Sequence, residues 1–518
     1  MRNYQTTEIQ GGQGTMNASQ SPPSIKIEDV VLAESITTEH DTWEKDGGIA
    51  PFNSVAVSGG IVGLWDFFSA TQVQELIAAT DTSSLYTVGP AGTVKTLGTS
   101  LSAPAVWHFA EGATGTTKAV FITNNARTMQ LSRYDGTTFA AVTSPAADWI
   151  SGKRPSFAFS HNNRMYAGPG ASLHQIYASV VNVMDDYTTT PGALTWQVFP
   201  GEGQKLMGGC SFQRQAFLFK YPRGLYTLDD SNLDSATWGW RKITDAVGLV
   251  SPNALIQIAN DILFLSPDGL FHSLARTLVG SGDPIDSVVL PIQMHNYLRE
   301  SVSWLYAERA QMAFYEIKRK VYIALPAFGS QTNNLMIVLD GHNESSPNFT
   351  ISRRDQPTAL TTRRDDLTVG RPIIGSPDGV VYKIDQDVRT RADGSGYVGS
   401  YETKDIDLVP TGQYRANLQE LEIVFARGGN WTLTVDVYLD GSYSETLTFL
   451  QSSQGGALDF MFLDTDSAIL GYDSLLQSRQ RLRGTCRRIK LRGSNGTPGG
   501  SFSVVTHLVH FITGSERP

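Results

Sequence analysis

The sequence predicts an all-β protein in which a β-propeller of about six to seven blades precedes a C-terminal β-sandwich-like domain. Three observations favour this fold class. Strand-and-turn phrases recur along the first three quarters of the chain, aromatic residues and glycine are abundant, and the pattern changes near residue 389. At 518 residues the chain is too long for one ordinary core, so we expect more than one domain. Its 23 Phe, 19 Tyr, 9 Trp and 49 Gly suit many strands joined by tight turns.

Residues 1–50 are predicted to form a polar arm with one strand. That strand is S-I-K-I-E-D-V-V-L, residues 24–32, and it is a candidate to complete a blade elsewhere in the ring. The first ten residues lack the apolar core of a signal peptide.

The propeller is predicted over residues 51–388, where a strand ending in an aromatic or aliphatic anchor recurs. The anchors are Tyr86, Tyr134, Tyr177, Tyr226, Phe271, Val338 and Tyr382. Five of their six spacings lie between 43 and 49 residues, near the period of a propeller blade. Each anchor strand follows another strand, as in P-S-F-A-F-S-H-N-N-R-M-Y-A-G, in which N-N is typical of a hairpin turn. Each unit therefore has the pattern of an antiparallel blade.

The phrase S-P-D-G occurs twice, at Ser266 and Ser376, each time before an aliphatic residue. Proline fixes φ at the entry of a turn, aspartate caps its own turn, and glycine adopts positive φ freely. We interpret both copies as turns into a blade strand, at equivalent places two blades apart.

The sixth spacing is longer: 67 residues separate Phe271 from Val338. This interval holds the only stretch with helical periodicity, and we expect a helical insertion near 290–310. The residues that can share one face of it are Ile292, His295, Tyr297, Leu298, Val302, Leu305 and Tyr306.

The blade pattern stops near residue 389. Residues 389–400 resemble a linker, and residues 401–518 contain strands with a period of two, such as W-T-L-T-V-D-V-Y-L and R-R-I-K-L-R-G. A sandwich is the fold that this pattern favours.

The search for catalytic, cofactor and metal sites gives no candidate residues. The chain contains no G-x-S-x-G and no G-x-x-x-x-G-K-[ST]. His507 and His510 are three apart on a predicted strand, so they should point to opposite faces. The paired carboxylates, such as Asp229–Asp230, lie in turn-like contexts where aspartate is common. We therefore expect no enzymatic activity and no cofactor.

Charge gives two further expectations. The net charge of −9 argues against a nucleic-acid-binding surface over the bulk of the chain, and no apolar run is long enough for stable membrane insertion. The two cysteines, Cys210 and Cys486, are too few for a disulfide scaffold.

The C-terminal domain carries an unusual charge pattern. Residues 428–478 hold seven acidic and no basic residues, whereas residues 479–492 hold seven basic and no acidic ones. A solvated strand face is the default interpretation. A sharper hypothesis is a head-to-tail subunit contact, and transient contact with DNA phosphates is a third. The candidate contact residues are Arg488, Lys490, Arg492, Asp459, Asp464 and Asp466.

Several phrases are similar to those of the β-propeller nozzle proteins of short-tailed bacteriophages, also described as tail tubular or packaged-DNA-stabilising proteins. The resemblance covers about residues 50–512 and is carried by S-G-K-R-P-S-F-A-F-S-H-N-N-R-M-Y-A-G, Q-R-Q-A-F-L-F-K-Y-P-R-G-L-Y-T-L and A-N-D-I-L-F-L-S-P-D-G-L-F-H-S-L. The closing R-R-I-K-L-R-G-S-N-G and F-S-V-V-T-H-L-V carry it too.

The resemblance implies a structural virion protein. Six copies would form a tail nozzle ring below the portal–adaptor complex, extend and close the DNA-ejection channel, and anchor fibres, spikes or other tail parts. The protein would be made and assembled in the host bacterial cytoplasm, reside in the virion tail, and contact genomic DNA non-specifically. Two alternatives from other classes remain: a propeller enzyme that degrades polysaccharide, and a carbohydrate-binding receptor-recognition tail protein.

Overall fold

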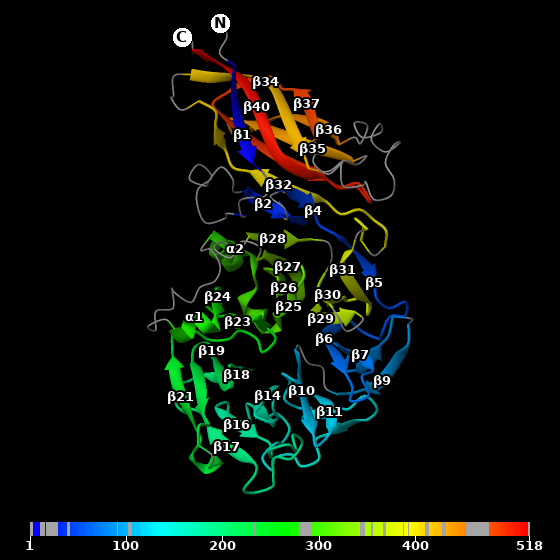
Figure 1. The fold of residues 1–518 in the computed structure, drawn as a ribbon, viewed down its shortest axis with the longest axis vertical. Coiled ribbons are helices and arrows are strands. Elements are labelled where there is room, and N and C mark those ends of the chain that lie inside the picture. Colours follow the sequence, from blue (N-terminus) through cyan, green and yellow to red (C-terminus); the bar gives the residue numbers. More distant parts are fainter. Residues whose placement is uncertain are drawn as a thin grey trace, which may run out of the picture.

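The computed structural model describes residues 4–10, 16, 30–38, 42–90, 92–101, 106–232, 234–279, 293–341, 348–353, 356–365, 369–386, 388–391, 393–409, 414–426, 431–451 and 476–515. Among the residues that the structure describes, strands make up nearly all of the regular secondary structure. Figure 1 shows a ring of small sheets in the lower half and a second β-domain at the rim of the ring. The first and last described strands pair with each other in this second domain.

Seven antiparallel units form the ring, which we number as blades one to seven. Five are separate four-stranded sheets, one is a three-stranded sheet, and one is the four-stranded part of a larger, ten-stranded sheet, in agreement with the prediction of about six to seven blades. Blade one consists of β6 (Ile61–Phe68), β7 (Gln74–Thr80), β8 (Leu85–Val88) and β9 (Val94–Gly98), and blade two of β10 (Trp107–Thr114), β11 (Thr117–Asn124), β12 (Ser132–Tyr134) and β13 (Phe139–Ala141). Blade three consists of β14 (Phe157–His161), β15 (Arg164–Gly168), β16 (Gln175–Ala178) and β17 (Leu194–Gln197). Blade four consists of β18 (Lys205–Phe212), β19 (Gln215–Tyr221), β20 (Leu225–Asp229) and β21 (Gly239–Thr244).

Blade five is the three-stranded sheet, and a short helix packs on it. The strands of blades five and six are β22 (Leu255–Ile258), β23 (Asp261–Leu265) and β24 (Phe271–Ser273), then β25 (Gln311–Tyr315), β26 (Lys320–Pro326), β27 (Asn333–Asp340) and β28 (Asn348–Ser352). Helix α1 (Leu274–Val279) follows β24 directly, and its Leu274 is buried in the same core cluster as Phe264 of β23. A 3₁₀-helix, η3 (Ser235–Thr237), precedes β21 in blade four.

Blade seven closes the ring with a strand from the other end of the chain. Its strands are β29 (Ala359–Asp365), β30 (Val369–Gly375) and β31 (Val381–Gln386), and β5 (Gly48–Pro51) pairs with β31 as the fourth. The closing strand is therefore β5 and not the predicted segment 24–32. The described part of that segment belongs to β2 (Val30–Glu34), which pairs in the second domain.

The two S-P-D-G phrases form the same turn in blades five and seven. In both, the serine N–H donates to the carbonyl four residues on, at 3.0 Å for Ser266 and 3.2 Å for Ser376. The glycines adopt positive φ, 85° at Gly269 and 80° at Gly379. Each aspartate carboxylate then accepts a hydrogen bond from the residue four positions on, His272 at 3.0 Å or Tyr382 at 2.5 Å. The turn interpretation is confirmed.

Facing blades are held together by apolar cores and by polar links between neighbours. Between blades one and two, Phe67 and Ile77 pack with Trp107 and Val120 in one buried cluster. Beside this core, the Tyr134 hydroxyl donates to Glu75 of the neighbouring blade at 2.8 Å. Such links satisfy polar groups that the packing of blade on blade would otherwise leave buried and unpaired.

Glu202 is a denser link, in the connection between blades three and four. It lies 3.2 Å from Lys220 and 2.8 Å from Lys242, and it accepts a hydrogen bond from Tyr226 at 2.6 Å. The hydrogen bond from Lys242, followed by that from Tyr226, lowers the pKa of Glu202 from 4.5 to about 2.

Because the pKa of Glu202 is lower in the folded state, its ionisation stabilises the fold above its ordinary pKa, and this contribution is lost as the pH falls from about 4.5 towards 2. We expect Glu202→Gln to lower the free energy of unfolding at neutral pH, and to lower it progressively less within that window. Denaturant titrations of both proteins across this pH range measure the difference. A difference that is independent of pH would contradict the prediction.

The second domain is a sandwich of two sheets. One sheet contains β1 (Tyr4–Gln10), β3 (Ile36–Thr37), β4 (Trp43–Lys45), β34 (Tyr414–Phe425), β37 (Leu476–Arg481), β38 (Thr485–Cys486) and β40 (Ser503–Ser515). The other contains β2, β32 (Gly399–Thr403), β33 (Ile406–Asp407), β35 (Trp431–Leu439), β36 (Ser442–Gln451) and β39 (Arg488–Asn495). Their inner faces meet in one core, with Ile423 and Val509 from the first sheet and Val435 and Ile489 from the second.

The sandwich and the propeller share a continuous sheet. Strand β28 of blade six lies parallel to β2, with Glu34 opposite Ile351, and the Ser35 N–H donates to the Ile351 carbonyl at 2.6 Å. The segment 389–400, predicted as a linker, lies against β4: Arg389 pairs with Glu44 at 2.6 Å, and Tyr397 is buried. The N-terminal strands thus divide between the two domains.

The interval before blade six contains two helical segments, α2 (Gln293–Ser301) and the 3₁₀-helix η4 (Trp304–Arg309). Leu298 and Val302 are buried, as the periodicity suggests. Leu305 is 81% exposed, because α2 ends at Ser301 and the tighter η4 turns this side chain outward. The single helical face predicted through Tyr306 is therefore wrong beyond residue 302.

Candidate functional site: the central cavity

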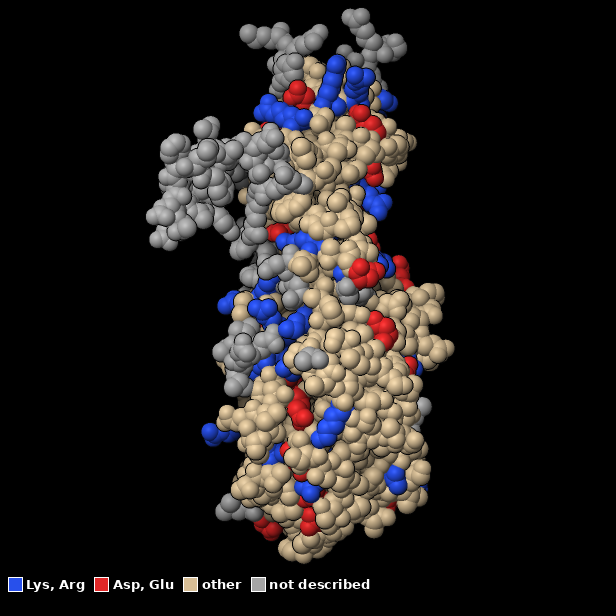
Figure 2. Space-filling model, turned by 90° about the vertical axis from the view of Figure 1, so that its right-hand side faces the viewer, with Lys and Arg blue, Asp and Glu red and all other residues tan. Residues whose placement is uncertain are grey.

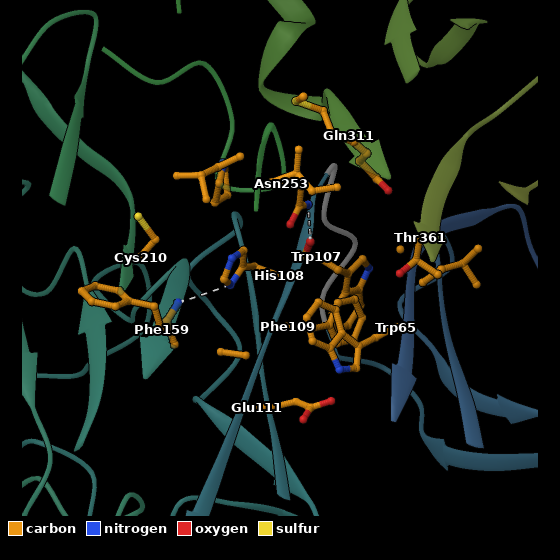
Figure 3. Close-up of a pocket in the computed structure, with 18 of the residues that line it drawn as sticks. Trp65, Trp107, His108, Phe109, Glu111, Phe159, Cys210, Asn253, Gln311 and Thr361 are labelled. Carbon is orange, nitrogen blue, oxygen red and sulfur yellow. Dashed lines mark hydrogen bonds between the residues drawn. The ribbon is translucent and has the colours of Figure 1, made fainter. Parts of the chain in front are cut away.

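The first strand of every blade lines a cavity of about 540 Å³ at the centre of the ring. These strands are β6, β10, β14, β18, β22, β25 and β29, and Figure 3 shows side chains from several of them converging on the open centre. The volume suits a small molecule. No described helix is long and apolar enough to cross a membrane.

One wall of the cavity is aromatic. The rings of Trp65 and Phe109 are stacked, with centroids 6.0 Å apart and planes 19° from parallel. Phe159 and Cys210 line the opposite side in Figure 3. Burial raises the pKa of the Cys210 thiol, so this cysteine is an apolar wall residue and not a reactive thiolate.

Two carboxylates line the cavity, and both have partners. Asp66 accepts two hydrogen bonds of 2.9 Å from the Gln74 amide and lies 3.2 Å from the Arg363 guanidinium of blade seven. Burial raises the pKa of Asp66 above its usual value. Glu111 lies 2.9 Å from Lys118. Because Asp66 ties blade one to blade seven, we assign it a structural role.

His108 is a neutral acceptor in the cavity wall. Its Nδ1 accepts a hydrogen bond from the Ala158 N–H at 3.3 Å, and burial lowers its pKa to about 4. Asn253 donates to the Trp107 carbonyl at 2.8 Å, so it also serves the wall. Among the residues that the structure describes, no group of three or more His, Cys, Asp and Glu side chains could hold a metal ion.

Ser211, whose hydroxyl is a possible nucleophile, lies at the rim of the cavity. The sequence analysis did not identify it. Its hydroxyl contacts His161, and His161 contacts Asp230, from three separate strands or loops of blades three and four. These residues lie 50 and 69 positions apart along the chain, so no local motif marks them. The sequence did hold one indication that these side chains could meet: Ser211 and His161 each lie just before a hairpin turn.

The predicted subunit-contact residues of β39 form pairs within the chain. Arg488 lies 2.7 Å from Asp407, and Lys490 lies 2.8 Å from Glu402. Arg492 stands opposite Asp436 in the register with β35. Asp459, Asp464 and Asp466 lie outside the described residues. This local pairing agrees with the default interpretation of a solvated strand face, and the subunit contact stays a prediction.

The two histidines of β40 point to opposite faces, as predicted. His507 is buried and lies 2.7 Å from the Tyr401 hydroxyl, and burial lowers its pKa to about 3. His510 contacts Thr6 at 2.9 Å and Glu422 at 3.2 Å on the other side.

No protein-family model and no curated protein sequence matches this chain. Among solved structures, the WD40 β-propeller domain of Doa1 is similar over 66% of this chain and 97% of that one, at 8% identity and a TM-score of 0.39. The computationally designed Ika8 protein is similar over 65% of this chain and 99% of that one, at 12% identity and a TM-score of 0.37.

A third similar structure is PorZ, a surface component of the type-IX secretion system of Porphyromonas gingivalis. It is similar over 78% of this chain and 46% of PorZ, at 13% identity and a TM-score of 0.36. At these identities and scores, the likenesses carry no argument about function. The assignment of a propeller fold rests on the strand order of the blades and on the closed ring that they form in this chain.

Proposed function

We propose that this protein is a structural component of a bacteriophage tail, the subunit of a nozzle ring. The observation that carries the proposal is the joining of the propeller to the sandwich through one ten-stranded sheet, with the N-terminal strands built into both. A ring that is subject to mechanical force needs subunits whose domains keep a fixed orientation relative to each other. The phrases similar to tail nozzle proteins extend over both domains.

The DNA path of such a ring runs between copies and not through the propeller. A cavity of about 540 Å³ does not admit a duplex whose major groove alone is about 12 Å wide. The net charge of −9 suits a channel wall that does not retain phosphates. Adaptor, portal, fibres and DNA are the partners of this proposal.

The outer flank of blade one is the surface that suits a contact between copies. Only four of the 60 residues from Pro51 to Ala110, a range that contains all of blade one together with short parts of blades seven and two, are charged, against 18% of the whole chain. Figure 2, which faces this side, shows few charged side chains over the propeller. Val55 is 52% exposed there, next to Gly92, and Thr96 of β9 is exposed too. Charged residues are depleted in the cores of protein interfaces.

Mass measurement of the purified protein, alone and with the adaptor complex, tests the proposal. We expect a six-fold assembly on the adaptor, and we expect Val55→Asp to weaken it at least about tenfold, because a charge would be buried in the contact. Ile317→Asp, at an exposed hairpin of blade six, is the matched control and should assemble normally. A monomer that never joins the adaptor and cleaves polysaccharide would overturn the proposal.

The carbohydrate-binding alternative needs an exposed aromatic platform on the sandwich. Tyr443 is 58% exposed, but its ring meets Tyr438 edge-on, at 75° and 5.9 Å. This pair does not form a flat stacking surface, so it does not favour that alternative.

A further inference from the structure

Ser211, His161 and Asp230 form a hydrogen-bonded series between blades three and four. The Ser211 hydroxyl lies 2.8 Å from His161 Nδ1, and His161 Nε2 lies 3.0 Å from an Asp230 oxygen. His161 is 3% exposed, whereas Ser211 is exposed and lines the central cavity. The series therefore runs from a buried base to a hydroxyl that solvent and ligands can reach.

The hydrogen bonds fix the proton on the imidazole. A carboxylate can only accept, so His161 Nε2 carries the proton that it shares with Asp230. The lone pair of Nδ1 then faces the Ser211 hydroxyl, which donates to it. Asn162 donates to the same Asp230 oxygen at 2.6 Å and holds the carboxylate in place. This is the arrangement of nucleophile, base and orienting acid that a serine hydrolase requires.

The backbone of Ser211 offers a donor for the developing oxyanion. Phe212 and Gln215 close a two-residue hairpin whose turn residues, Gln213 and Arg214, have φ of 48° and 63°. The pair next to the closing pair, Ser211 and Ala216, is then a non-hydrogen-bonded pair. The Ser211 N–H thus points away from β19, to the edge of β18 that borders the cavity.

We propose that Ser211 is the nucleophile of an ester-hydrolysing site in the central cavity, with His161 as its base and Asp230 as a positioning residue. The cavity, with Trp65 and Phe109 on one wall, suits a carboxylic ester with a small acyl group. The proposal rests on this geometry alone and does not depend on the proposed ring.

The reaction balances with water as the only co-reactant. Ser211 Oγ attacks the ester carbonyl while its proton passes to His161 Nδ1. The bond to the alcohol breaks, and that alcohol leaves with the proton from Nδ1. Water then adds to the acyl-serine and gives a proton to Nδ1. Collapse releases the carboxylic acid and returns the proton to Ser211.

A purely structural link between blades is the competing interpretation. Other links, such as Tyr134 with Glu75, also join neighbouring blades. A structural link stabilises the fold but gives the serine no heightened reactivity, so covalent labelling separates the two roles.

The full chain is treated with a fluorophosphonate probe, and hydrolysis of p-nitrophenyl acetate is followed separately. We expect labelling at Ser211, its loss together with hydrolysis in Ser211→Ala, and a slower labelling rate, by about tenfold or more, in Asp230→Asn. Ser442→Ala, which removes an exposed serine hydroxyl on β36 of the sandwich, outside the cavity, is the matched control and should label normally.

Thermal unfolding of each variant checks that the fold is intact. If Ser211→Ala proves unstable, mass spectrometry of the labelled peptide from the unmodified sequence gives the same answer. Failure of the native chain to react with the probe, or equal labelling in a folded Ser211→Ala protein, would overturn the proposal.

Discussion

We expect Gly379→Ala to destabilise the protein by about 3 kcal/mol or more, from two causes that add. Gly379 lies in the second S-P-D-G turn with a φ of 80°, which is unfavourable for alanine. An added Cβ would also lie 2.3 Å from the Val57 carbonyl oxygen, a backbone atom that cannot move alone. Denaturant unfolding of both proteins measures the loss.

Gly329→Ala is the matched control for this prediction. Gly329 has the same φ of 80°, but no atom lies within 4 Å of the position of its Cβ. It should therefore show only the conformational cost, about 1 kcal/mol. Equal losses at the two glycines would mean that the contact between the S-P-D-G turn and residue 57 does not constrain the ring.

We expect Asp66→Ala to cost about 3 kcal/mol, because it breaks a buried ion pair where the ring closes. Arg363 of blade seven and Asp66 of blade one have side chains only 11% and 6% exposed. Removing the carboxylate takes an ion partner from Arg363 and two hydrogen bonds from Gln74. The free energy of unfolding, together with the midpoint of thermal unfolding, reports the effect.

Asp66→Asn separates charge from hydrogen bonding at this position. Its amide keeps one acceptor of similar shape, so part of the hydrogen bonding survives while the charge is lost. We expect a loss between those of the native protein and Asp66→Ala. If the alanine variant is as stable as the native protein, the link between blades one and seven does not contribute to ring closure.

The blades could be predicted because their signals are local. The turn chemistry of S-P-D-G, and of N-N at Asn162 and Asn163, depends on a few adjacent residues that prefer positive φ or a fixed turn entry. The alternation of apolar and polar residues along short segments predicted the strands between these turns. The helical insertion also followed from its period, up to the point at which α2 ends.

Features that join distant segments could not be predicted in this way. Strand β5 is only four residues long, and nothing in its sequence names β31 as its partner. The Ser211, His161 and Asp230 series depends on how blade three packs on blade four. The register of two strands on separate blades leaves no spacing that a single sequence reveals.

The C-terminal charge pattern illustrates the same limit. In the sequence, a block of acidic residues is followed by a block of basic ones. This pattern is compatible with ion pairs inside one chain and with ion pairs between two copies. Arg488 pairs with Asp407, and Lys490 pairs with Glu402. Both carboxylates lie outside the acidic block of residues 428–478. The nearest partners were set by the neighbours of β39 in its sheet.

The pairing of β1 with β40 has a consequence for synthesis. Tyr4 stands opposite Ile512, so the first described strand meets its partner only after the last described strand has left the ribosome. Strand β5 must likewise wait for β31. The propeller therefore cannot close before β31 (Val381–Gln386) has been synthesised, and the sandwich cannot be completed before β40 (Ser503–Ser515) follows, so the nascent chain carries open sheet edges up to those points.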